Sequence, residues 1–259
     1  MDLAVCTKLI PDPATAGVLD PATGRLVRRR PLVLDAADAA GMEMALRLCQ
    51  SSGGGTVTAV TMAPGGSLVG LRSALAMGAT GAVVVTDDAL AGSDALATAK
   101  VLAAVIGRLH ADLVVAGTES TDGYTGTVGV QLAELLSLPS VTFVRLAEVV
   151  DGVLVVDRQS QGGVDQVECA LPALVTVMAG SVAPRFPTYR GLRAARTAPV
   201  ELLSVADLGL PVGVVGVAGA RQRVVSVGDL PRRPPGVVVV DDGHAHRRIL
   251  ELLERVSVR

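Results

Sequence analysis

The residues whose types and spacing could do chemistry form a loop rich in glycine, serine and threonine. This loop, residues 117–129, follows the apolar run Leu113–Ala116 and leads into a helical pattern that extends to Leu136. Small residues between a strand and a helix N-terminus present free amides and the positive end of the helix dipole to an anion. We therefore predict a phosphate-binding loop. The alternative interpretation is a simple turn with an N-cap.

Other clusters of polar residues are less suited to chemistry. The glycine-rich stretch Ser51–Thr56 ends a helical pattern and enters a strand, so its amides would not point at a ligand, and we expect a connection there. His244 and His246 form at most half of a metal site, and an exposed helix start accounts for them. The three histidines of the chain do not assemble with a nucleophile into a catalytic set. We expect neither a metal site nor a catalytic residue.

The elements that must position the loop alternate between two patterns. Short β-branched runs are typical of strands buried on both faces, and the segments between them carry apolar residues at helical spacing. This alternation predicts right-handed crossovers and an α/β fold with a mostly parallel, doubly wound sheet. The expected strands of this part are residues 3–9, 56–62, 82–86 and 113–116.

After Pro139 the pattern changes to strands without helices, which predicts an antiparallel portion of the sheet. From residue 199 the chain alternates short apolar runs with glycine and proline, and it ends in a helical pattern over residues 245–256. Such an extended tail cannot build a core of its own. We therefore divide the chain into an α/β domain, residues 1–198, and a C-terminal arm with a helix, residues 199–259, that packs on a partner.

Composition excludes several classes of function. With 23 basic and 25 acidic residues and no long run of either, the chain shows no electrostatic footprint for nucleic acid. No apolar run is long enough for membrane insertion, and no leader pattern precedes the first strand, so we expect a cytoplasmic protein. Cys6, Cys49 and Cys169 are too far apart for a disulfide framework and are expected to be buried thiols.

Five blocks of sequence, in order, resemble the β subunit of electron transfer flavoprotein. The resemblance implies an adenine-nucleotide-binding α/β fold and an electron carrier rather than an enzyme. It also implies a heterodimer with an α subunit that carries the redox-active FAD, a donor dehydrogenase, and an acceptor such as an electron transfer flavoprotein–quinone oxidoreductase, a ferredoxin or a flavodoxin. The blocks are Leu3–Asp12, Leu75–Ala79, Asp112–Gly117 with Thr121–Gly129, Leu171–Thr176, and Pro184–Leu192.

The resemblance also implies a nucleotide site in this chain that holds AMP or a second FAD. One departure affects it: the family pattern of Asn-Pro at the start of the second helix reads Asp35-Ala36 here. By position, the nucleotide contacts would be Cys6, Asp35, Ala36, Ala37, Asp38, Met62, Gly117, Thr118, Glu119, Ser120, Thr121, Asp122, Gly123, Tyr124, Thr125, Gly126, Thr127 and Val128. The residues expected to dock a partner are Pro187, Thr188, Tyr189 and Arg190.

Two other functions compete with the electron carrier. A stand-alone adenine-nucleotide-binding regulatory or stress-type domain would use the same loop, but it has no need of the long tail after Pro199. A nucleotide-dependent hydrolase or transferase would need a base and a nucleophile that the chain does not offer. The long tail therefore favours a subunit whose C-terminal arm packs on a partner protein.

Overall fold

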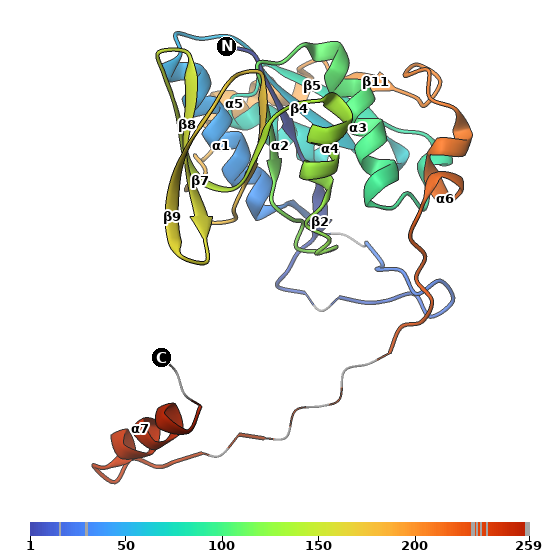
Figure 1. Cartoon of the computed structure of the whole chain (residues 1–259). Coiled ribbons are helices and arrows are strands. Elements are labelled where there is room, and N and C mark those ends of the chain that lie inside the picture. The colour runs from blue at the N-terminus through green and yellow to red at the C-terminus, as the bar shows by residue number, and fades with distance from the viewer. Residues whose placement is uncertain are drawn as a thin grey trace. The chain divides into compact units, whose positions relative to one another are not determined.

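The computed structural model describes the chain except at residues 16, 29, 30, 229, 230, 232, 234, 237 and 257–259. The chain divides into two compact units, Met1–Val224 and Val225–Arg259 (Figure 1). The second unit contains one helix, α7 (Ala245–Arg255), among its described residues. The helix expected at the end of the chain is confirmed.

The first unit is built on one large sheet that is mostly parallel, as the sequence predicts. Every pairing from β11 to β7 is parallel, and only β8 and β9 join in antiparallel fashion. The described strands, in spatial order, are β11 (Glu201–Leu203), β5 (Gly81–Val85), β4 (Val57–Met62), β1 (Leu3–Cys6), β6 (Leu113–Gly117), β10 (Ala173–Val177), β7 (Ser140–Val150), β8 (Val153–Ser160) and β9 (Gly163–Cys169). A separate antiparallel ribbon pairs β2 (Leu9–Pro11) with β3 (Leu32–Leu34).

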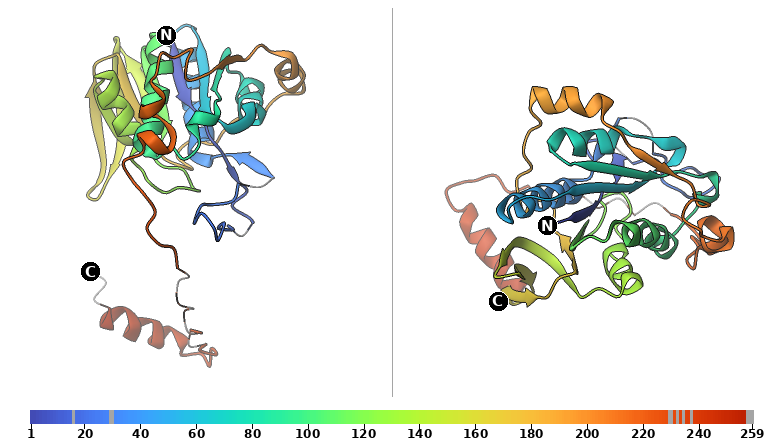
Figure 2. Two further views of the ribbon diagram at one scale, coloured as in Figure 1. Left: turned by 90° about the vertical axis from the view of Figure 1, so that its right-hand side faces the viewer. Right: turned by 90° about the horizontal axis from the view of Figure 1, so that it is seen from above.

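Helices cover both faces of the sheet. The period of two along β1 sends Leu3 and Val5 into the core beneath α1 (Ala36–Ser51) and α2 (Val69–Met77). The same period sends Ala4 and Cys6 into a second core beneath α3 (Ala95–Leu109) and α4 (Val128–Leu136), and the two layers are seen from above in Figure 2. The fold is therefore a doubly wound α/β layer structure, as expected.

The winding reverses beside β1. From β1 the chain builds β4 and then β5 on one side, and α3 carries it back to β6 on the other side. The carboxyl ends of β1 and β6 therefore flank a topological switch point, which is where open α/β sheets bind ligands. Among the described residues, no helix has the length and apolar character needed to cross a membrane.

Two segments differ from the sequence-based expectation. The first unit ends at Val224 rather than at residue 198, because β11 pairs with β5 and because Val205 and Val215 are buried in the second core. Tyr189, expected to dock a partner, begins a helix that the sequence analysis did not predict, α5 (Tyr189–Thr197). Its N-cap is Thr188, whose Oγ1 accepts a hydrogen bond from the Gly191 amide at 3.0 Å. A short helix, α6 (Gly216–Gly219), follows later.

We predict that Val205→Ala lowers the free energy of unfolding by about 1–3 kcal/mol, because the side chain is 2 % exposed. The control is Val225→Ala, which changes a side chain that is 86 % exposed and should have almost no effect. Denaturant unfolding measures both variants. If Val205→Ala were neutral, residues beyond 198 would not belong to the core.

Candidate functional site

The predicted phosphate-binding loop lies at the switch point. It leaves β6 at Gly117 and enters α4 at Val128, and its tip, residues 123–127, is exposed. The N-cap residue Thr127 makes no side-chain hydrogen bond to α4, which leaves the first amides of the helix available to a ligand. Gly126 has a φ of +61°, in the region that favours glycine. The backbone therefore has the form that the sequence predicts.

A buried carboxylate joins this loop to the start of α1. Asp35 is fully buried, and its Oδ1 accepts a hydrogen bond from the Ala37 amide at 3.0 Å, which caps the helix. Its Oδ2 accepts from both the amide and the hydroxyl of Thr121, at 2.8 and 2.9 Å. Asp35, which stands where the family pattern has Asn, therefore fixes two backbone segments that are far apart in sequence.

A second carboxylate, Asp122, lies in the loop itself, next to Thr121. Asp122 is almost wholly buried, and its oxygens accept from Lys8 Nζ at 2.5 Å and from Arg28 Nε at 2.8 Å. Lys8 Nζ also donates to Ser120 Oγ at 3.1 Å. Burial alone would raise the pKa of Asp122, but Lys8 and Arg28 hold that pKa below its ordinary value.

Lys8 and Arg28 keep 40 and 45 % of their side chains exposed beside the loop. Sequence reasoning did not assign either residue to the site. Lys8 belongs to the first of the five sequence blocks, but nothing in that block indicated a contact with the loop. No sequence pattern marks Arg28, because only the tertiary structure brings its segment to Asp122. Two cations thus border a loop that was expected to hold phosphate with its backbone.

Asp38 and Cys6 lie under the switch point and are both buried. Asp38 Oδ2 accepts from the Lys8 amide at 2.7 Å, and the Gly117 amide also donates to this carboxyl. Burial, and after it the charge of Asp35, raises the pKa of Asp38 to about 8. Burial, and after it the charge of Asp38, raises the pKa of the Cys6 thiol to about 12, so Cys6 is protonated at neutral pH.

The structure brings most of the predicted nucleotide residues to one edge. Cys6, Met62 and Gly117 end strands β1, β4 and β6, and these strands are neighbours. The start of α1 packs directly on Gly117, where an added Cβ would lie 3.0 Å from the Ala37 Cβ and 2.6 Å from Asp38 Oδ1. Only a glycine fits at this contact.

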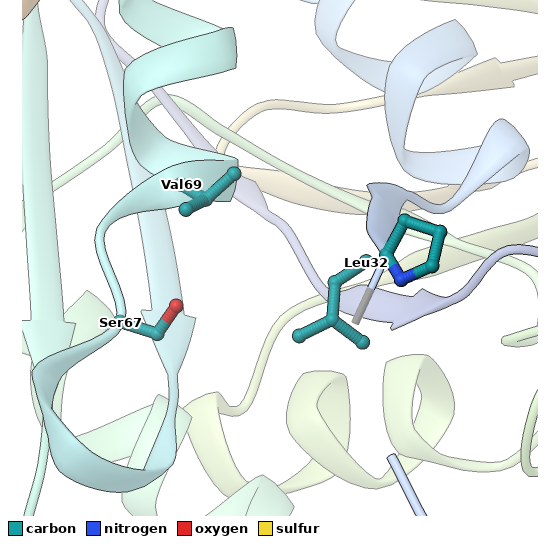
Figure 3. A pocket seen from close by; sticks show the side chains of 4 residues that line it. Leu32, Ser67 and Val69 are labelled. Carbon is teal, nitrogen blue, oxygen red and sulfur yellow. The ribbon is translucent and has the colours of Figure 1, made fainter. Parts of the chain in front are cut away.

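The predicted docking residues lie on another surface. Tyr189 and Arg190 begin α5, which packs on α2, and both are exposed. A recess of about 450 Å³ lies near α2, lined by Pro31, Leu32, Ser67 and Val69. Figure 3 shows Ser67 and Val69 on one side of this recess and Leu32 on the other. None of its lining residues belongs to the predicted nucleotide contacts.

We predict that Asp38→Asn changes how stability depends on pH. Folded Asp38 binds its proton up to about pH 8, whereas the ordinary pKa of 3.8 applies in the unfolded chain. Between these values the folded chain binds more protons, so this carboxyl makes the free energy of unfolding fall as pH rises. Asn cannot ionise, and the variant should lose that fall.

Denaturant unfolding of both proteins at intervals between pH 4 and pH 8 measures this effect. The difference between the two curves isolates Asp38 from carboxyls whose pKa is lowered, such as Asp122 and Glu43. A constant difference across the window would show that Asp38 is ionised in the folded protein.

Comparison with known proteins agrees with the resemblance of the five sequence blocks. The family model described as the electron transfer flavoprotein domain matches residues 23–208. The chain is 34 % identical to the electron transfer flavoprotein subunit beta of Thermoanaerobacterium thermosaccharolyticum, over 100 % of this chain and 99 % of the relative. It is 35 % identical to the subunit of the same name from Mycobacterium leprae, over 85 % of each chain.

A further relative is named caffeyl-CoA reductase-Etf complex subunit CarD, from Acetobacterium woodii. It is 33 % identical over 92 % of each chain. The residues that the family model matches contain every described strand of the large sheet except β1, together with the loop at the switch point and α5. The chain therefore belongs to the electron transfer flavoprotein β subunit family.

Proposed function

We propose that this chain is the nucleotide-holding subunit of a heterodimeric electron carrier. In this proposal an α subunit carries the redox-active FAD, and the chain described here holds an adenine nucleotide, AMP or a second FAD, at the switch point. The observation that carries the proposal is the pinned loop, residues 118–127, whose tip is exposed and whose backbone is fixed by Asp35 and Asp122. Family membership supports the electron-carrier role.

The residues present fit a phosphate-bearing ligand. The backbone at Gly126 and Thr127 leads into uncapped α4, so a phosphate there would accept amide hydrogen bonds and interact with the helix dipole. Lys8 and Arg28 place positive charge beside the loop, and Asp122 neutralises only part of it. A protonated Asp38 adds no negative charge beneath the ligand at neutral pH. The exposed carboxylate of Glu119 lies close to Gly126, where its Oε2 is 3.7 Å from the position of an added Cβ. A phosphate there would therefore rely on the free amides of the loop and on Lys8 and Arg28, and Glu119 would have to turn away from it.

Two apolar residues at the strand ends, Cys6 and Met62, would exclude water from the base of the nucleotide. Cys6 and Met62 end neighbouring strands and offer sulfur and aliphatic surface, which suits a flat purine. The high pKa of the Cys6 thiol keeps this wall uncharged. The redox chemistry in the proposal belongs to the flavin of the α subunit, and this chain contributes binding and orientation.

The proposed partners are the α subunit, a donor dehydrogenase and an electron acceptor of the quinone oxidoreductase, ferredoxin or flavodoxin kind. The name of the relative CarD places that protein in a complex with a reductase, which supports assembly with a dehydrogenase-type enzyme. In α7 the side chains of Ile249, Leu250, Leu252 and Leu253 are exposed. An apolar helix face of this kind favours a partner over a stand-alone regulatory domain.

We predict that Gly126→Val empties the site in the purified heterodimer. Valine is strained at a φ of +61° and places a branched side chain where phosphate would approach the amides. The matched control is Gly152→Val, which imposes similar strain at a φ of +82° in the β7–β8 turn, with no atom within 4 Å. The control should keep its nucleotide.

Quantifying the nucleotides released on denaturation decides what the wild-type site holds. Two FAD per heterodimer support a second flavin in this chain, and one FAD with one AMP support a simple carrier. Finding one FAD and no further adenine nucleotide would contradict the proposal.

A further inference from the structure

The segment between β2 and β3, the two strands of the small ribbon, contains a hairpin that we call the strap. It comprises residues 17–28, all of which the structure describes. Leu19 and Leu26 pair across the hairpin as an antiparallel bridge. Beside this pair the Val27 amide donates to the Val18 carbonyl oxygen at 2.8 Å. The side chains of Val18 and Leu19 are exposed, so hydrogen bonds within the strap give it its form, and these two side chains do not anchor it in a core.

The strap crosses the carboxyl edge of the large sheet. At one side Arg28 Nε donates to Asp122 Oδ2 at 2.8 Å, in the loop that follows β6. At the other side the Arg25 guanidinium lies against Gly92, in the turn that follows β5, where an added Cβ would be 2.9 Å from Arg25 Nη2. The sheet order places β4 and β1 between β5 and β6. The strap, blue in Figure 1 and below the sheet there, therefore spans the ends of the two strands proposed to face the base of the nucleotide.

The root of the strap is fixed firmly, whereas the strap itself has few attachments. In β2, Ile10 is buried and Leu9 packs against Gly70 at the start of α2. Among the described residues, the backbone hydrogen bonds of the strap stay within it, and the ion pair between Arg28 and Asp122 is its one polar link to the rest of the first unit. A segment with so few attachments can open locally while the core stays folded.

Asp122 can release Arg28 and still keep its place in the loop. Its two oxygens serve different cations, since Oδ1 accepts from Lys8 Nζ and Oδ2 accepts from Arg28 Nε. Lys8 Nζ also donates to Ser120 Oγ, so Lys8 holds the carboxylate within the loop. The Arg28 side chain is 45 % exposed, which lets water and salt weaken its ion pair. The link to the strap can therefore break while the loop keeps its form.

We propose that the strap is a gate over the proposed nucleotide site and that the ion pair between Arg28 and Asp122 is its latch. The proposal rests on the proposed function, because a gate needs a ligand to retain. With the latch closed the strap crosses the ends of β1 and β4, and a nucleotide held there leaves only after the strap moves. Opening breaks the latch and the contact of Arg25 with Gly92, and it keeps the hydrogen bonds within the strap. The latch therefore sets the rate of nucleotide exchange.

The rate at which the co-expressed heterodimer releases nucleotide tests the latch. The purified complex is stripped, loaded with radiolabelled AMP, or with ADP where AMP does not bind, and then mixed with an excess of the unlabelled nucleotide. Arg28→Gln should release the label roughly three- to tenfold faster than the wild type. Arg28→Lys keeps the positive charge and should stay closer to the wild-type rate.

Two controls show whether the effect belongs to this ion pair. Arg108→Gln removes another exposed arginine, which pairs with Glu201 in β11 at the far edge of the sheet, and it should leave the release rate unchanged. Salt at about 0.5 M should speed release from the wild type more than from Arg28→Gln, because it screens a pair that the variant lacks.

The motion of the strap is measured without any nucleotide. Nitroxide labels at Thr23→Cys, on the exposed tip, and at Ala91→Cys, next to Gly92, report their separation by electron paramagnetic resonance. One short separation is expected with Arg28 present, and a second, longer one in Arg28→Gln. A single short separation in that variant would overturn the proposal, whether its release rate is unchanged or faster, because the strap would then stay closed without its latch. A strap that opens over a site that binds neither AMP nor ADP would count against the proposed function alone.

Discussion

The carboxylate of Asp35 is the interaction on which the candidate site depends. It is fully buried, and its two oxygens cap α1 and hold Thr121 at the same time. Removing a partner from a buried hydrogen-bonded carboxylate leaves other polar groups unsatisfied, at a cost of about 1–3 kcal/mol for each group. The carboxyl end of the sheet thereby acquires a loop with a fixed shape in place of a flexible connection. A fixed loop binds an anion without a further loss of backbone entropy.

Charges of both signs surround this loop, with the cations Lys8 and Arg28 on one side and the exposed carboxylate of Glu119 beside Gly126. The carboxylate of Asp122 forms ion pairs with Lys8 and Arg28. Asp38 is mostly protonated at neutral pH because its pKa is about 8. The buried carboxyls nearest the loop are therefore paired with cations or protonated, apart from Asp35 at the positive end of α1. On another surface, Glu43 positions the segment before α5. Helix α1 thus carries Asp38, whose Oδ2 accepts from the Lys8 amide beneath the candidate site, and Glu43, whose Oε2 accepts from Arg185 Nε before α5.

Much of the fold could be predicted because each core element has a local signal. The β-branched run at Val57–Met62 and the apolar stripe of α3 lie where periodicity places them. The loop between β6 and α4 was likewise predicted from its glycines and hydroxyls. Helix α5 was missed because its sequence is polar and arginine-rich, and its packing depends on one glycine and on Arg72 from α2. Arg28 could not be predicted, since its contact with Asp122 spans 94 residues.

Amide hydrogen exchange on the nucleotide-stripped heterodimer tests the central claim most directly. Adding AMP or FAD should slow exchange at the amides of residues 126–129, where the loop enters α4, and leave the β7–β8 turn at Gly152 unchanged. Protection is expected to fall away in a variant with Asp35→Ala, because the loop would lose its anchor at Thr121. Unaltered exchange at residues 126–129, with either nucleotide at saturating concentration, would contradict the account.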